Sequence, residues 1–217
     1  FALIITLGGM KVIGYTDVIQ VLVLLIGGLI TSYIALTVVS EKFGLGTDAL
    51  AGFNQLLIVA PEHFDMIFDK PDANSTPEQV NHYSSLPGLA MLVAGMWIAN
   101  LNYWGCNQYI TQRALGADLK TARTGILFAS FLKLLMPLLV VVPGIAAYVL
   151  YQNGELQEQM MTNGEFREDN AYSAVLGFLP TGLRGLSMAA LTAAIVASLA
   201  GKANSISTIY TLDIYKK

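Results

Sequence analysis

Residues 97–113 read WIANLNYWGCNQYITQR, and this stretch decides the class of fold. The preceding run, 86–101, is almost purely apolar, yet at ~1.5 Å per residue it covers only about 24 Å of a hydrocarbon core about 30 Å thick. The same helix must therefore finish its crossing with polar side chains, which we expect to face protein or a water-filled cavity rather than lipid. These include Asn100, Asn102, Asn107 and Gln108. A helix interrupted in mid-membrane beside such groups is typical of secondary transporters.

The composition also indicates a membrane protein. Hydrophobic residues make up 54% of the chain and charged residues only 12%, about half the charged share of an average soluble domain. The single cysteine, Cys106, excludes an internal disulfide, and no spacing in the sequence suggests a metal cluster. Because the chain starts with Phe1 rather than methionine and stops at Lys217 without a tail, we expect an internal fragment of a longer polypeptide. The predicted fold class is an all-α membrane protein.

The hydropathy pattern predicts one transmembrane domain over residues 1–217, with one partial and four complete spans. The partial span is Phe1–Gly9, which closes at a glycine pair. After the link Met10–Gly14, either Thr16 or Asp17 is suited to cap the next helix. The complete spans are predicted at 15–40, 86–112, 121–151 and 184–212, and the polar loops at 41–85 and 152–183. Within the second loop, residues 171–183 are expected to be a partly apolar lead-in that packs at the outer surface.

The distribution of lysine and arginine predicts the orientation. The short link after the interrupted helix carries Arg113, Lys120 and Arg123 against Asp118 alone, and basic residues also mark the first link and the end of the chain. The two long loops are mostly acidic. By the positive-inside rule, the short basic links are cytoplasmic and the acidic loops are external. We therefore expect a multi-pass protein of the cell membrane, with the lipid bilayer as its surroundings.

Signals for an enzyme or for nucleic-acid binding are weak. His63 and His82 both lie in the first acidic loop, where solvation is the simplest explanation for them. Gly201 and Lys202 form a Gly-Lys pair that lacks the upstream glycine of a phosphate-binding loop. No nucleophile, base and orienting group stand out together, so we expect neither an enzyme nor a nucleic-acid partner.

Four motifs make the sequence recognisable. They occur in the order GYTDVIQ (14–20), NYWGCNQYITQR (102–113), LKLLMP (132–137) followed by Pro143-Gly144, and NSISTIYTLDIY (204–215). In this order they resemble the solute:sodium symporter family, most closely its bacterial sodium/galactose and sodium/glucose transporters. The resemblance covers nearly the whole chain. It implies a LeuT-type fold of two inverted repeats of five helices, of which this chain would hold the end of core helix 4 through core helix 8. The first core helix, which contributes to both sites in the family, would be missing.

The resemblance implies sodium-coupled symport of a sugar such as glucose or galactose by alternating access. Sodium would be the coupling ion, and no other cofactor is expected. A different solute, such as an inositol, a sialic acid or an amino acid, is the main alternative within the family. A transporter-like sensor domain that drives a downstream signalling domain is an alternative from another class, and a kinase-like sequence after the last helix would favour it.

Three residues are candidates for the sugar site. By the resemblance, Tyr103 matches the aromatic residue that closes the inner side of the sugar pocket, and Asn100 matches a residue that contacts this tyrosine and the sugar. Their spacing of three places them on one helix face, although an ordinary interhelical hydrogen bond with Tyr103 as packing remains open. Lys133 lies about 18 Å along its helix from Thr121, too deep for its ~6 Å stem to reach an interface easily. The matching lysine donates hydrogen bonds to sugar hydroxyls, and a structural ion pair is the alternative.

The resemblance also places the sodium site. The family uses the carbonyl of a small residue and two consecutive serines on core helix 8, which here align with Ala194 and with Ala197-Ser198. One hydroxyl ligand is therefore absent, although Ala197 retains its carbonyl. Lys202, one turn beyond Ser198, is a possible modulator that reaches the cation site, pairs with Asp17 or points into cytoplasmic water. Asp17 matches an acidic residue on the sodium exit path, and a helix cap is its alternative role.

Overall fold

A computed structural model describes residues 2–85 and 88–216 of the chain. The chain divides into two compact units. The first contains Phe1–Ala60 and Arg123–Lys217, and the second contains Pro61–Ala122. Phe1, Lys217 and the predicted start of the interrupted span, Leu86, lie outside the described residues.

Nearly all regular structure is helical, and several helical segments are long and apolar. Within the described residues, four segments are long and apolar enough to cross a membrane: Gly14–Lys42, Gln79–Cys106, Leu119–Gln152 and Thr181–Tyr215. They overlap the four predicted complete spans, and the second lies nearer the N-terminus than predicted, at Gln79–Cys106 instead of 86–112.

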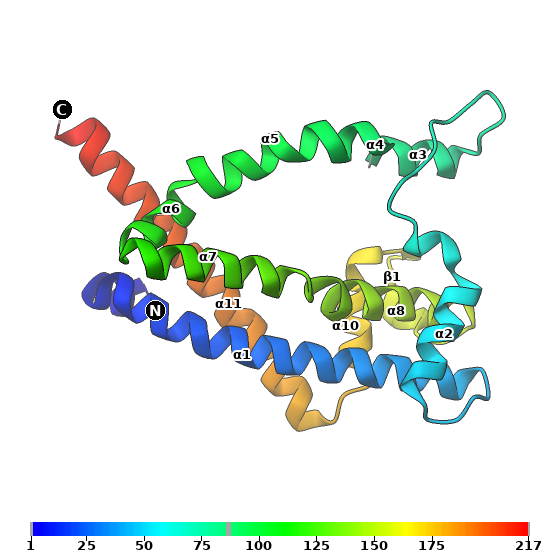
Figure 1. The fold of residues 1–217 in the computed structure, drawn as a ribbon. Coiled ribbons are helices and arrows are strands. Elements are labelled where there is room, and N and C mark those ends of the chain that lie inside the picture. Colours follow the sequence, from blue (N-terminus) through cyan, green and yellow to red (C-terminus); the bar gives the residue numbers. More distant parts are fainter. Residues whose placement is uncertain (1, 86–87, 217) are drawn as a thin grey trace. The chain divides into compact units, whose positions relative to one another are not determined.

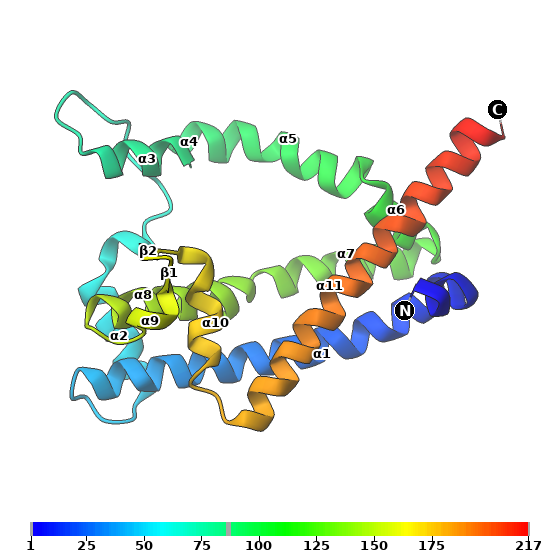
Figure 2. The ribbon, with the colours of Figure 1, turned by 180° about the vertical axis from the view of Figure 1, so that it is seen from behind.

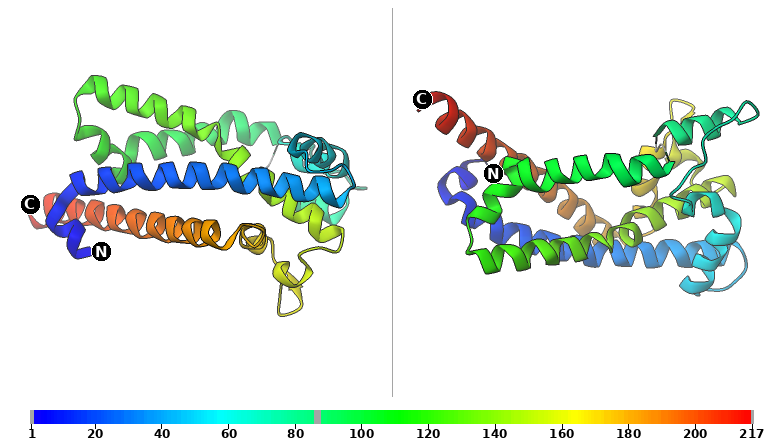
Figure 3. Two further views of the ribbon diagram at one scale, coloured as in Figure 1. Left: turned by 90° about the horizontal axis from the view of Figure 1, so that it is seen from below. Right: turned by 45° about the horizontal axis from the view of Figure 1, so that its top comes forward.

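The N-terminal helix differs from the sequence prediction. Helix α1 runs without a break from Ala2 to Lys42, so the predicted link at Met10–Gly14 is part of the helix. Its first turns bend away from the rest (Figure 3). Glycines such as those at 8 and 9 each cost a helix about 1 kcal/mol but keep their N–H donors, so they weaken the helix without ending it. Thr16 is not a cap, because its hydroxyl donates to the carbonyl of Val12 at 3.0 Å, one turn back in the same helix.

The first acidic loop begins with a short helix that packs against α1. Helix α2, Ala49–Val59, starts at Asp48, whose side chain accepts a hydrogen bond from the N–H of Leu50 at 2.9 Å. Helices α1 and α2 lie against each other at the C-terminal end of α1 (Figure 1). The predicted loop is therefore partly ordered helix.

The third span is irregular in its middle. Helix α7, Leu119–Lys133, is followed by a turn at Leu134 and Leu135, a π-helical segment η4, Pro137–Val141, and helix α8, Val142–Gln152. In the turn, each N–H donates to the carbonyl three residues back, at 3.0 Å for Leu134 and 3.1 Å for Leu135. Pro137 explains the irregularity, because it has no N–H to offer the carbonyl of Lys133.

The second acidic loop folds against α8 (Figure 2). It contains helix α9, Gln157–Met160, a hairpin of strands β1, Met161–Thr162, and β2, Glu165–Phe166, a 3₁₀ turn η5, Glu168–Asn170, and helix α10, Ala171–Leu176. Ala174, Val175 and Leu176 of α10 are buried, so the predicted apolar lead-in does pack on protein. The Arg184 guanidinium donates to the carbonyls of Gly177 and Leu179 just after α10, where the helix dipole favours a positive charge.

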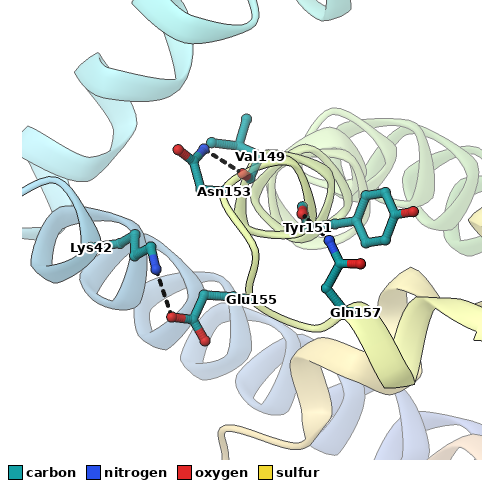
Figure 4. Close-up of polar contacts among 6 residues, drawn as sticks. All are labelled: Lys42, Val149, Tyr151, Asn153, Glu155 and Gln157. Atoms are coloured by element: carbon teal, nitrogen blue, oxygen red, sulfur yellow. Dashed lines mark hydrogen bonds and ion pairs between the residues drawn. The ribbon is translucent and has the colours of Figure 1, made fainter.

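An ion pair lies at the end of the first unit where α1 ends and α8 is followed by a turn (Figure 4). The Lys42 ammonium lies 2.8 Å from a carboxylate oxygen of Glu155, which joins the end of α1 to the turn after α8. In that turn, the Asn153 side-chain amide donates to the carbonyl of Val149 at 2.8 Å, and that of Gln157 donates to the carbonyl of Tyr151 at 3.2 Å. Fully buried side chains from α1, α2, α8, α9 and α10 fill the space behind it, including Val39, Leu56, Val149, Leu150, Met160 and Val175.

The last span packs along α1. Helix α11, Thr181–Ile209, continues into a π-helical segment η6, Tyr210–Tyr215. Helices α1 and α11 are in contact, run in roughly opposite directions and cross at an oblique angle (Figure 1). The buried residues of α11 share one face and are mostly small: Ser187, Ala190, Ala197, Gly201 and Ser205.

The second unit contains the interrupted helix. It starts with a 3₁₀ turn η1, Pro61–Phe64, and helix α3, Pro77–Ser85. Then follow α4, Gly88–Ala90, the π-helical segment η2, Met91–Gly95, helix α5, Met96–Leu101, a second π-helical segment η3, Asn102–Cys106, and helix α6, Gln108–Leu115. The helix therefore continues through the predicted mid-membrane interruption in π-helical form and ends only at Asn107, whose backbone is extended.

Candidate functional site

Asn100 and Tyr103 lie where α5 passes into η3. A π-helical turn carries one more residue per hydrogen-bonded loop than an α-helix and often marks a functional site. Both candidate residues belong to the second unit.

Asn100 is exposed and anchored to its own helix. Its side-chain amide nitrogen donates to the carbonyl of Met96 at 2.8 Å. One amide N–H is thus used to orient the side chain, while the amide oxygen retains its capacity to accept hydrogen bonds from a ligand. The contact of Asn100 with a sugar stays a prediction.

The Tyr103 ring is partly exposed and braced by its neighbour. Its exposed fraction is 40%, and it meets the Trp104 ring edge-on with 5.4 Å between the centroids. Such a contact restricts the ring while leaving part of its surface open for stacking. The predicted one-turn neighbourhood of Asn100 and Tyr103 is present, because they lie three residues apart in continuous helix.

Sequence reasoning did not predict how the interrupted helix ends. The Asn107 side chain caps α6 by accepting from the N–H of Tyr109 at 3.1 Å. Further along α6, the Arg113 guanidinium lies over the Tyr109 ring, 4.4 Å from its centroid. Asparagine followed by a short amphipathic run is a recognisable capping signal, so the break could have been placed at Asn107 from the sequence.

Lys133 is the last residue of α7, directly before the irregular turn. Lys133 is exposed. Lys133 belongs to the first unit and the pair Asn100 and Tyr103 to the second, so their convergence on one sugar stays a prediction.

The predicted sodium ligands lie on α11. Ala197 is 3% exposed and lies on the buried face of the helix, while Ala194 and Ser198 are half-buried. Other hydroxyls of α11 donate to the carbonyl one turn back, at 2.9 Å for Thr192 and 3.0 Å for Ser205. Within the described part of the chain, the Ser198 hydroxyl makes no such bond, so its oxygen is available to a cation.

A Cβ added to Gly27 of α1 would lie 3.4 Å from the hydroxyl oxygen of Ser187, which fixes one point of contact between α1 and α11. A path from the predicted sodium ligands on α11 to Asp17 on α1 stays a prediction.

Lys202 is exposed. The roles that the sequence leaves open for it, at the cation site, beside Asp17 or in cytoplasmic water, stay predictions. Among the described residues, no three His, Cys, Asp or Glu side chains gather to hold a metal ion. A sodium ion at this site would depend on carbonyl and hydroxyl oxygens.

The chain is similar to known proteins along its whole length. The sequence model of the Sodium:solute symporter family matches residues 1–217. The chain is 46% identical to the "Sodium/glucose cotransporter" of Vibrio parahaemolyticus, over 100% of this chain and 39% of that protein. It is 35% identical to the "Sodium/myo-inositol cotransporter 2" of Bos taurus, over 96% of this chain and 31% of that protein. The chain thus spans two fifths or less of the length of these relatives.

Proposed function

The chain belongs to the sodium:solute symporter family, and on that premise we propose that the protein couples the uptake of a sugar to the entry of sodium. Family membership confirms the resemblance drawn from the four motifs, and it makes the protein a transporter rather than an enzyme. The four apolar segments long enough to cross a membrane are consistent with a multi-pass membrane protein.

The observation that carries the proposal is 46% identity to a sodium/glucose cotransporter along the entire chain. Identity to the sodium/myo-inositol cotransporters named above is lower, at 35%. Glucose and galactose are therefore the first solutes to test. A cyclic polyol such as myo-inositol is the second, because it offers a similar ring of hydroxyls.

In the proposed sugar site, Asn100 accepts or donates hydrogen bonds, Tyr103 stacks on the sugar ring, and Lys133 donates to hydroxyls. The exposed part of the Tyr103 ring and the anchored Asn100 amide support these roles. A neutral sugar is recognised through directed hydrogen bonds and an aromatic face, and this set of side chains supplies both.

In the proposed sodium site, the carbonyls of Ala194 and Ala197 and the hydroxyl of Ser198 are ligands, and Asp17 lies on the path to the cytoplasm. Each helical carbonyl has a second lone pair beyond its helix hydrogen bond, which a cation can use. Sodium bound there would favour an outward-facing, sugar-ready state, and its release inside would weaken sugar binding. A LeuT-type arrangement with external acidic loops and cytoplasmic basic links completes the proposal.

Counterflow with the full-length protein in liposomes tests this function. Labelled glucose, galactose and myo-inositol are offered with an inward sodium gradient, and a potassium gradient of equal size is the control. We expect sodium-dependent uptake of one of the two sugars above that of myo-inositol. Uptake that is equal under both gradients would contradict sodium coupling, and preference for myo-inositol would replace the proposed substrate.

A further inference from the structure

The backbone carbonyl of Leu138 lacks a regular partner within its own helix. In an α-helix the N–H of Val142 would donate to it, but that N–H donates to the carbonyl of Pro137. In a π-helix the donor would be residue 143, which is a proline and has no N–H. Two prolines thus leave a strong acceptor unsatisfied inside an apolar span, where water does not replace the missing donor.

Ser32 of α1 supplies that donor. Its hydroxyl oxygen lies 2.7 Å from the carbonyl oxygen of Leu138 and 2.9 Å from that of Gly28. The Ser32 residue is only 3% exposed. Close approach is possible because residue 28 is a glycine: a Cβ there would lie 3.0 Å from a methyl carbon of Leu139. The π-helical segment η4 is therefore fixed to α1 by a hydrogen bond and by tight packing.

The contact of Ser32 with Leu138 lies within a span whose two halves, α7 and α8, differ in how deeply their residues are buried. Helix α8 packs on α1 and buries residues along most of its length, including Val142, Ala146 and Leu150. All of α7 is described, and none of its residues is buried. Between the halves lie the turn at Leu134 and Leu135 and the segment η4, and Lys133 is the last residue of α7 before the turn. The direction of α7 relative to α8 thus depends on the geometry of the turn and of η4, and α1 holds η4 in place.

We propose that Ser32 is a positioning residue for sugar binding, because its bond to the Leu138 carbonyl fixes η4 and, through it, the adjoining turn that follows Lys133. Without the hydroxyl, the carbonyl must find another donor by rearranging the turn, and α7 then moves relative to α8. The Lys133 ammonium is displaced with it. The part of the inference that concerns the sugar rests on the proposed function, whereas the part that concerns the turn does not.

Ser32→Ala in the full-length protein is the first variant, and Thr31→Val is its matched control. Thr31 is the neighbouring residue, is fully buried, and donates only to the carbonyl of Gly27 in its own helix, at 2.8 Å. In liposomes, Ser32→Ala should raise the half-saturating sugar concentration about threefold to tenfold, as expected for one lost hydrogen bond. Thr31→Val should raise it less than about twofold, and equal shifts for both variants would overturn the inference.

A double-mutant cycle with Lys133→Ala separates positioning from general stability. If Ser32 acts through Lys133, Ser32→Ala should weaken sugar binding little further once Lys133 is already alanine. If the double variant loses sugar affinity by the product of the two single-variant losses, the effect of Ser32→Ala is merely structural, and this result contradicts the inference. If Ser32→Ala does not accumulate in the membrane, Ser32→Ala/Pro143→Ala should restore it, because residue 143 then offers an N–H to the turn. Failure of that rescue also counts against the inference.

Pulsed electron spin resonance tests the turn without any substrate. Spin labels at Leu127 in α7 and Gln152 in α8, with Cys106 replaced by serine, report the distance between the two halves. We expect Ser32→Ala to shift or broaden the distance distribution and Thr31→Val to leave it unchanged. An unchanged distribution in Ser32→Ala overturns the inference. A full-length protein that transports no sugar but shows the shift contradicts the proposed function alone.

Discussion

Gly52 of α2 lies directly against the carbonyl oxygen of Leu36 in α1. A Cβ added to Gly52 would lie only 2.0 Å from that oxygen and 3.3 Å from the backbone nitrogen of Ser40. The two backbones therefore approach as closely as they can, and only glycine fits at this crossing. This contact fixes α2 on the buried end of α1, beside the fully buried Leu56 and Val39.

Gly52→Ala should destabilise the first unit by about 1–3 kcal/mol, because the methyl group forces two helix backbones apart. The measurement is the thermal unfolding midpoint of the full-length protein in detergent. Gly125→Ala is the control, since a Cβ there meets nothing within 4 Å. A Gly52→Ala midpoint equal to that of Gly125→Ala would show that α2 does not pack on α1 as described.

Tyr103→Ala should abolish sugar accumulation while leaving protein levels near those of the wild type. Tyr103→Phe should retain much of the activity, because the edge-on contact with Trp104 and the stacking surface both survive. Uptake of labelled sugar into liposomes is the measurement. Normal transport by Tyr103→Ala would rule out the proposed pocket.

Lys133→Ala should raise the sugar's apparent Kd by about 10- to 100-fold, equivalent to ~1.5–3 kcal/mol for a charge-assisted hydrogen bond. Sodium affinity should change much less. Titrations of the same preparation with sugar and with sodium make the comparison. Equal losses of both affinities would identify Lys133 as part of a structural ion pair instead.

The long apolar runs were predictable from the sequence, and the local irregularities were not. A run such as 121–151 can hardly be anything but a span, and the structure has one helical segment there, Leu119–Gln152. The π-helical segment η4 depends on which carbonyls lose their donors and on what the neighbouring helix supplies. The donor comes from a residue distant in sequence, as the bond from Ser32 to Leu138 shows.

The site was predictable where it follows the family motifs, and less so where it depends on distant segments. Asn100 and Tyr103 are neighbours because helix geometry makes them so. Thr16 was wrongly assigned as a possible cap because glycines at 8 and 9 suggested a helix end, whereas the helix continues and the hydroxyl bonds one turn back. The pair Pro137 and Pro143 was visible in the sequence, yet its consequence required knowing that Ser32 lies opposite.

Asp118 should stabilise the start of α7 in a pH-dependent way. Hydrogen bonds from the Thr121 hydroxyl at 2.5 Å and from its N–H at 3.1 Å hold the pKa of Asp118 below its usual 3.8. A lowered folded pKa means that the stabilisation is present above about pH 4 and is lost as the pH falls through the folded value. Asp118→Ala should therefore lower the unfolding midpoint at pH 7, and the gap to wild type should narrow toward pH 3. A gap that does not change with pH would show that the carboxylate charge is not what caps the helix.

The sodium site should be improvable at Ala197. A cation that lacks one hydroxyl ligand binds more weakly, and Ala197→Ser restores an oxygen on the buried face of α11, beside Ser198. We expect this change to lower the half-saturating sodium concentration about threefold to tenfold, the range of one added ligand bond.

Lys202→Met should have a smaller effect, less than about twofold, because the Lys202 side chain is exposed and water and salt screen its charge. Sodium dependence of sugar uptake in liposomes is measured for both single variants and for the double variant. A Lys202→Met shift larger than that of Ala197→Ser would mean that the ammonium does approach the ion and repels it. If neither variant changes the sodium dependence, the cation binds elsewhere and Ala194, Ala197 and Ser198 are not its ligands.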